Sequence, residues 1–195
     1  MELVGEARMR AGERRFALRA ATSGRHAELD GMIGDFATLE DYRRYLNGQF
    51  AFRAAMEQAF EKAALPGGWR PTPAAEAMRE DFRDRGWQTP VPLPAPVFHS
   101  ADEWLGAAYV LQGASLGAQL LLRRAPALGL SGEHGARHLA VQAGALGEWR
   151  HFLSLLDEAS SFDPAKAAGA ALAVFDLAIR AARDAARAEC LDDAR

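Results

Sequence analysis

Apolar residues recur at helical spacing along almost the whole chain. Over residues 13–34, Leu18, Thr22 and Leu29 fall within one arc of about 100° on a helical wheel. This pattern predicts a first helix, with His26 on its inward side. No stretch alternates between apolar and polar residues over the length of a strand. The chain is therefore predicted to be all-α.

Capping motifs and prolines indicate where the later helices begin. A Thr-Leu-Glu-Asp motif opens a long aromatic helix over about 38–65. A short third helix is predicted over 73–86, with Pro73 at its first position. Ser100 is the first residue of another capping box, and it opens a helix over 101–124.

The last third of the chain continues the helical pattern. A glycine-containing loop is predicted over 125–135, and apolar periodicity resumes over 136–156. A turn at 160–164 then begins a final amphipathic helix. We expect six or seven helices in one domain over residues 13–190, preceded by a flexible N-terminal segment at residues 1–12.

Four alternate prolines interrupt the helices at 89–98. Proline lacks a backbone donor, so this segment is predicted to be an extended connection without a helical ladder. Its simplest interpretation is a link between two helices. A docking site for a proline-binding partner is the alternative.

Composition and charge exclude several classes of protein. The 195 residues carry 23 basic and 26 acidic side chains, a formal net charge of -3, which argues against binding to nucleic acid or an anionic membrane. Cys190 is the only cysteine, so the fold contains no internal disulfide. No apolar run reaches the ~18 residues of a membrane span, and no signal-peptide pattern is present. We expect a cytoplasmic protein.

The helix over 101–124 contains glycines that lower its intrinsic stability. Each costs about 1 kcal/mol relative to alanine. Gly106, Gly113 and Gly117 fall on one side of the helix, with Tyr109 beside them, so this face lacks side chains. Such a face lets a flat group approach the backbone and lets the helix bend. Close packing against a neighbouring helix explains the same pattern, and both interpretations remain open here.

His26 also has two interpretations. A lone histidine on an apolar helix face is often a core residue bonded to a carbonyl group. A neutral imidazole is also the commonest side-chain metal ligand, and one axial histidine leaves the other side of a haem open for oxygen. Arg19 lies two turns earlier on nearly the same face, either as a partner for a haem propionate or as a solvated charge.

Other kinds of site find little support. The sequence has no Glu-x-x-His pair, Cys-x-x-Cys or His-Glu-x-x-His motif, P-loop or dinucleotide fingerprint. His134 and His138 are four residues apart, but they lie in and beside a glycine-rich loop, and we interpret their spacing as chance.

Two segments together resemble the haem oxygenase family. Leu-Arg-Ala-Ala-Thr at 18–22, followed by His-Ala-Glu-Leu-Asp at 26–30, is similar to the proximal helix of these enzymes. Residues 109–119 resemble their glycine-bearing distal helix. Weaker similarity at 147–152 and 171–175 extends the resemblance over most of the chain. It is closest to bacterial members of the kind found beside bacteriophytochromes.

The resemblance implies a fold, a reaction and partners. Haem b would lie between the helix of His26 and a kinked distal helix. The haem would be both cofactor and substrate, opened by O2 to biliverdin with release of Fe2+ and CO. Electrons would come from a separate ferredoxin or reductase, and a bacteriophytochrome is a possible recipient of the biliverdin.

The resemblance also assigns roles to residues. His26 would be the single iron ligand, and Gly113 and Gly117 would form the catalytic distal contact. The other residues expected to contact haem are Arg19, Thr22, Tyr109, Ala114 and Arg150.

Two positions depart from the family pattern. Ala114 stands where mammalian members carry an acidic residue, and Gln112 where many bacterial members carry glutamate. These departures leave open a non-catalytic protein that binds or delivers haem. A relative of the same fold that acts on thiamin-type compounds, or as a di-iron oxidase, is a further alternative. The lack of a carboxylate–histidine cluster and of a central cysteine argues against it.

Overall fold

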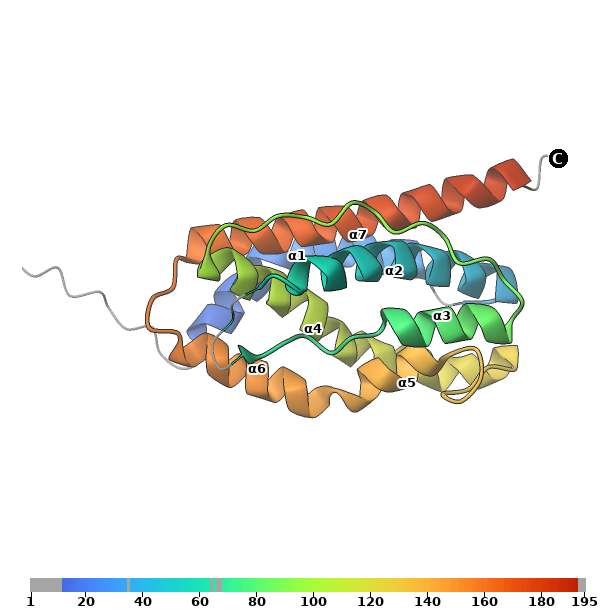
Figure 1. Cartoon of the computed structure of the whole chain (residues 1–195), viewed down its shortest axis with the longest axis horizontal. Helices are drawn as coiled ribbons and strands as arrows, with labels where there is room; N and C mark the ends of the chain where they lie inside the picture. Colours follow the sequence, from blue (N-terminus) through green and yellow to red (C-terminus); the bar gives the residue numbers. More distant parts are fainter. Residues whose placement is uncertain (1–11, 35, 64, 66–67, 193–195) are drawn as a thin grey trace, which may run out of the picture.

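The chain folds into a layered bundle of helices (Figure 1). The computed structural model describes residues 12–34, 36–63, 65 and 68–192. This part contains seven α-helices and no β-strand: α1 (Glu13–Ile33), α2 (Leu39–Phe60), α3 (Ala75–Asp84), α4 (Ala101–Arg124), α5 (Arg137–Gly144), α6 (Leu146–Glu158) and α7 (Pro164–Asp192). The all-α prediction is confirmed. The N-terminal segment expected at 1–12 lies, apart from Gly12, outside the described residues.

The predicted starts of α2 and α4 are confirmed by their caps. The Thr38 hydroxyl accepts a hydrogen bond from the Asp41 amide at 3.1 Å, and the Asp41 carboxylate accepts one from the Thr38 amide at 3.0 Å. At α4, the Ser100 hydroxyl accepts from the Glu103 amide at 3.3 Å. Each cap satisfies amide groups that a helix start leaves without a partner.

The predicted start of α3 is wrong by two residues. The helix begins at Ala75, and Pro73 lies outside it. Glu57 of α2 accepts hydrogen bonds from the amides of Ala74 at 2.6 Å and Ala75 at 3.0 Å. A carboxylate from another helix therefore caps α3, and it takes the place of the local proline signal.

α7 is the helix on which the rest of the bundle is assembled. It runs the length of the molecule and packs against α1, α2 and α4 (Figure 1). α4 crosses the interior, where it also packs against α5 and α6. Backbones meet closely where α2 crosses α7, since a Cβ atom added to Gly48 would lie 3.1 Å from the Ala182 Cα atom. α1 and α4 are therefore both supported by α7.

The proline segment is extended, as predicted. It crosses beside α2, where the Leu93 amide donates to the Ala51 carbonyl at 3.0 Å (Figure 1). Val91 and Val97 are exposed. The segment links α3 to α4, and the docking alternative stays a prediction.

One segment, Ala101–Leu128, has the length and mean hydropathy, 1.3, of a membrane-crossing helix. It consists of α4 and a following 3₁₀ turn, Ala125–Leu128. Core helices of folded proteins also meet these criteria, and α4 is packed among other helices of the bundle. Length and composition therefore give only weak support for a membrane span.

Candidate functional site

His26 lies at the rim of α1, so its predicted inward position is wrong. Its side chain is 63% exposed, and its Nδ1 atom lies 2.8 Å from the Asp30 carboxylate. One edge of the ring faces Phe175 of α7, with 5.8 Å between ring centroids. α1 buries Leu18 and Thr22, and His26 is rotated about 80° and about 40° from them. The helical wheel gave the side of α1 that packs on its neighbours. It did not show that His26 lies at the edge of that side, beyond the residues that are buried.

Two surface ion pairs join α1 to α7. Arg25 pairs with Asp176 at 2.8 Å, and Glu28 pairs with Arg183 at 2.7 Å. Thr22, predicted to contact haem, is buried, and its hydroxyl donates to the Leu18 carbonyl at 2.8 Å. The Thr22 proton is therefore engaged within α1.

The second half of α4 presents an open apolar face. Leu116 and Leu120 are 53% and 47% exposed, and Ala114 and Gly117 are exposed as well. A Cβ atom added to Gly117 would have no neighbour within 4 Å. One added to Gly113 would make ordinary contact with the Trp149 ring, at 3.7 Å. The glycines leave the backbone bare on this face of α4, and no neighbouring helix covers Gly117.

Gly106, on the first half of the same helix, instead serves close packing against a neighbouring helix. A Cβ atom there would lie 2.7 Å from the Ala167 carbonyl carbon of α7 and closer still to its oxygen. This glycine lets two helices pack closely. Both explanations of the glycine pattern therefore occur, at different positions of α4.

Positive charges on α1 act on a tyrosine of α4 at one end of this region. Tyr109 of α4 is half-buried, which raises its pKa, while the positive charges of Arg19 and Arg15 on α1 act in the opposite direction. The Tyr109 ring also packs against Trp149 of α6, with 5.6 Å between centroids. Arg19 is therefore near enough for its charge to act on the Tyr109 hydroxyl. Arg15 was missed, although it lies one turn before Arg19 on the same helix.

These groups suit a flat, mostly apolar ligand with negative charge at one end. His26 has its Nδ1 atom beside Asp30, so its Nε2 atom is free to bind a metal. The open stretch of α4 provides apolar contact. Arg15, Arg19 and Tyr109 supply positive charge and a hydroxyl group for carboxylates. Arg150 is exposed on α6, directly after Trp149.

Gln112 faces away from the open stretch. Its side chain is buried, accepts from the Thr72 amide at 2.9 Å and donates to the Ala145 carbonyl at 3.3 Å. It joins α4 to the segment before α3 and to the junction of α5 and α6. The Gln112 amide therefore joins parts of the fold. A glutamine at this position, in place of glutamate, leaves the open face of α4 unchanged.

A buried polar network lies among α2, α3 and α5, and sequence reasoning missed it. The Asp81 carboxylate lies 2.6 Å from the His138 Nδ1 atom and accepts from the Arg137 amide at 2.7 Å. Arg53 donates to the Leu111 carbonyl of α4 at 3.1 Å and to the Gln142 side chain. The partners are up to 89 residues apart in sequence, so no local pattern indicates them.

Burial decides the charge of His138. It lowers the pKa of this fully buried side chain, and the Asp81 carboxylate only partly opposes the effect. The neutral imidazole then donates its Nδ1 proton to Asp81. Within the described part of the chain, its Nε2 atom and the Ser115 hydroxyl are buried without a hydrogen-bond partner.

The two histidines at 134 and 138 do not form a site together. His134 is exposed and lies 3.7 Å from Asp84, whereas His138 is buried against Asp81. α5 starts at Arg137, so the two histidines do not share a helix. In the described ranges, no three His, Cys, Asp or Glu side chains gather as a metal site.

Comparison with known proteins identifies relatives of this chain. No family model matches the chain. "Heme oxygenase PigA" of Pseudomonas aeruginosa is 31% identical to it over 151 residues, covering 72% of this chain and 75% of that protein. The crystal structure of the NO- and CO-bound heme oxygenase from Neisseria meningitidis matches with a TM-score of 0.71 at 24% identity, covering 88% of this chain and 91% of that one. The structural match shows that the two chains share a fold.

Proposed function

Because the chain belongs to the haem oxygenase family, we propose that it opens haem b to biliverdin in an O2-dependent reaction that releases Fe2+ and CO. It is an oxidoreductase of the haem-degrading class. The observation that supports the proposal is that an accessible histidine and an uncovered glycine stretch lie on two helices, α1 and α4, that both pack against α7.

His26 is the proposed iron ligand. The Asp30 carboxylate lies 2.8 Å from Nδ1, and a carboxylate at this nitrogen favours the tautomer that leaves Nε2 free to bind iron. The Phe175 edge limits rotation of the imidazole ring. The ion pairs between α1 and α7 hold the helix that carries this ligand.

Gly113 and Gly117 are the proposed distal contact. Bound haem supplies the iron that binds O2 and the porphyrin carbon that is oxidised. Without side chains, the α4 backbone can lie directly over one face of the ligand and exclude water there. Ala114 keeps this face small, while Leu116 and Leu120 add apolar contact.

The propionates are placed at the end of the site marked by Tyr109. Arg19 is the proposed main partner, with Arg15 beside it, because both act on the Tyr109 hydroxyl. Arg150 remains a second proposed contact. Thr22 would contribute its methyl group, since its hydroxyl is bonded within α1.

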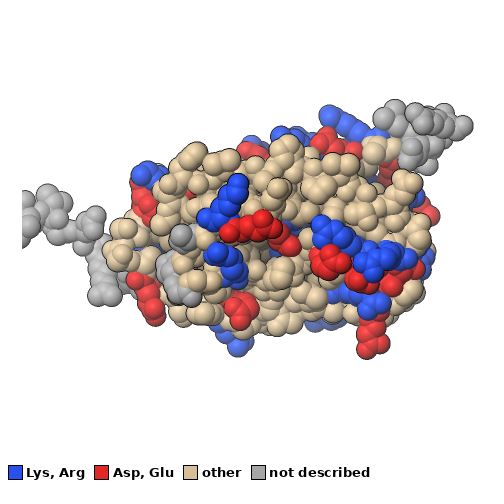
Figure 2. All heavy atoms as spheres, in the orientation of Figure 1, with Lys and Arg blue, Asp and Glu red and all other residues tan. Residues whose placement is uncertain are grey.

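The non-catalytic haem carrier is not favoured. It depended on Gln112 and Ala114, and Gln112 is a structural tie away from the open face. We propose that a ferredoxin or reductase supplies electrons in the cytoplasm. Biliverdin would then serve a bacteriophytochrome, or the released iron would be the useful product. Acidic and basic groups lie side by side on the face shown in Figure 2, which gives no support for nucleic acid as a partner.

The test is a haem titration of the wild-type protein and the His26→Ala variant, followed by ascorbate in air. We expect a sharp Soret band that depends on His26 and decays to a bilin absorption. His99→Ala, which changes another exposed histidine, is the matched control and should behave as wild type. A stable Soret band with no bilin would contradict the proposal, provided that free haem behaves normally.

A further inference from the structure

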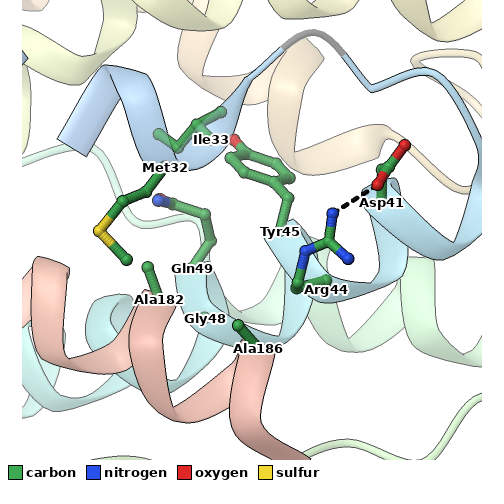
Figure 3. Close-up of a pocket in the computed structure, with 9 residues that line it drawn as sticks. All are labelled: Met32, Ile33, Asp41, Arg44, Tyr45, Gly48, Gln49, Ala182 and Ala186. Atoms are coloured by element: carbon green, nitrogen blue, oxygen red, sulfur yellow. Dashed lines mark hydrogen bonds and ion pairs between the residues drawn. The ribbon is translucent and has the colours of Figure 1, made fainter. Parts of the chain in front are cut away.

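A cavity of about 250 Å³ lies between the end of α1, the first half of α2 and the second half of α7 (Figure 3). Met32 and Ile33 of α1 and Ala182 and Ala186 of α7 form its apolar walls. Ile33 follows His26 by seven residues, which places it about 10 Å along α1 on nearly the same side. The cavity therefore lies about two turns of α1 from His26.

The cavity cannot close by a simple approach of its helices. Gly48 belongs to its lining, and a Cβ atom there would already lie 3.1 Å from the Ala182 Cα atom. α2 and α7 are thus in contact at this point. A cavity of about 150 Å³ is sufficient for benzene, so this one has room for a substituted ring.

Two polar side chains that line the cavity make no hydrogen bond within the described part of the chain. Tyr45 and Gln49 lie one turn apart on α2, and both line the space (Figure 3). Neither the Tyr45 hydroxyl nor the Gln49 amide makes a hydrogen bond within the described ranges of the chain. Burial raises the pKa of Tyr45, so its hydroxyl keeps its proton. Together the two groups offer uncharged donors and acceptors beside the apolar walls.

The guanidinium group at the cavity is already paired with carboxylates. Arg44 pairs with Asp41, as drawn in Figure 3, and with Glu189 at 2.6 Å. An anionic ligand would compete with these two carboxylates for the guanidinium group. The cavity therefore favours a neutral ligand over a carboxylate.

A five-membered lactam ring has the matching chemistry. It is neutral and flat, and it has one carbonyl acceptor beside one N–H donor. The carbonyl can accept from Tyr45 or the Gln49 amide nitrogen, and the N–H can donate to the Gln49 oxygen. Opening haem creates two such rings, because each pyrrole carbon next to the lost bridge gains an oxygen. The intact macrocycle has no lactam.

We infer that this cavity is a subsite for a neutral lactam and that, resting on the proposed function, it holds one terminal ring of the opened tetrapyrrole. It distinguishes product from substrate, because only the product carries the group that Tyr45 and Gln49 can bind. The closed ring can stay at His26, while the opened chain extends along α1 into the cavity.

The first test uses 2-pyrrolidinone and does not depend on haem. The wild-type protein and the variants Gln49→Leu, Tyr45→Phe and Ala186→Phe are titrated by NMR. We expect saturable shifts in wild type, affinity about tenfold weaker in Gln49→Leu and in Tyr45→Phe, and no binding in Ala186→Phe, where the added ring fills the space. Gln58→Leu, which changes an exposed glutamine on the same helix, is the matched control and should bind as wild type.

The second test measures biliverdin and haem affinity in the same variants. We expect Gln49→Leu to weaken biliverdin binding about tenfold while haem affinity stays within twofold of wild type. Absence of pyrrolidinone binding in wild type would overturn the lactam subsite. Pyrrolidinone binding with unchanged biliverdin affinity in the variants would overturn the assignment to the tetrapyrrole product. Intact lactam binding in a protein that never forms bilin would instead overturn the proposed function.

Discussion

Gly106 and Gly117 lie on nearly the same side of α4, yet their surroundings are opposite. Gly106 is buried against the backbone of α7, where no further carbon atom fits. Gly117, three turns later, faces open space and is flanked by two exposed leucines. One helix therefore uses the same residue for two purposes. The first glycine lets the fold form, and the second leaves room for a ligand.

This comparison shows why glycine spacing alone could not choose between packing and binding. The two halves of α4 differ in what covers them, and the covering helix is distant in sequence. α7 contacts the first half at Ala167, whereas a Cβ atom at Gly117 in the second half would have no neighbour within 4 Å. Stability measurements should then respond to Gly106, and ligand measurements to Gly117.

The largest effect is expected for Gly106→Ala. The added methyl group would collide with backbone atoms of Ala167, which cannot rotate away. We expect a loss of about 3 kcal/mol in unfolding free energy. Thermal unfolding should shift down by about 6 to 12 °C. An unchanged melting temperature would mean that α4 and α7 separate easily, and it would remove the contrast.

A smaller effect is expected for Gly117→Leu, which should weaken haem binding without lowering stability. The new side chain enters the proposed distal contact, so haem affinity should fall tenfold or more. Stability should rise by up to about 1 kcal/mol, since leucine favours helix more than glycine does. Gly24→Leu on α1 is the control, because Gly24 is also helical, exposed and free of neighbours within 4 Å. It should share the gain in stability and retain haem affinity.

The smallest effect concerns the buried network behind α4. Burial holds the pKa of His138 below its unfolded value of about 6.5, so the folded state favours the neutral ring. Its contribution is present above that pH and is lost as pH falls, by at most about 1.4 kcal/mol per pH unit.

Urea unfolding at pH 7.5 and 5.5 would measure this loss. His138→Gln should reduce the pH dependence, whereas His151→Gln, at an exposed position, should leave it unchanged. Equal pH dependence in both variants would show that another group is responsible.

Local signals were enough for the helices whose starts they govern. Thr38 and Ser100 cap the predicted helices because their partners lie three residues away. The start of α3 was misplaced because its cap, Glu57, comes from another helix. The Asp81–His138 pair was missed for the same reason, since its members are 57 residues apart.

The candidate site was predictable in its residues more than in its arrangement. Periodicity placed His26, Arg19 and the α4 glycines on helix faces, and the resemblance to haem oxygenases supplied their expected roles. It could not show that His26 lies at a rim, because the helix wheel does not reveal where a neighbour ends. It also could not assign Gln112 to a structural tie, since that depends on Thr72, 40 residues away.

The position of α7 has a consequence for the order of synthesis. α1 and α4, the two walls of the proposed site, are both supported by α7, which is made after both of them. The spacing of the walls is therefore set only after the C-terminal helix has left the ribosome. Before α7 has folded, haem can meet His26 while the distance between α1 and α4 is not yet fixed. Capture of haem therefore follows the folding of α7.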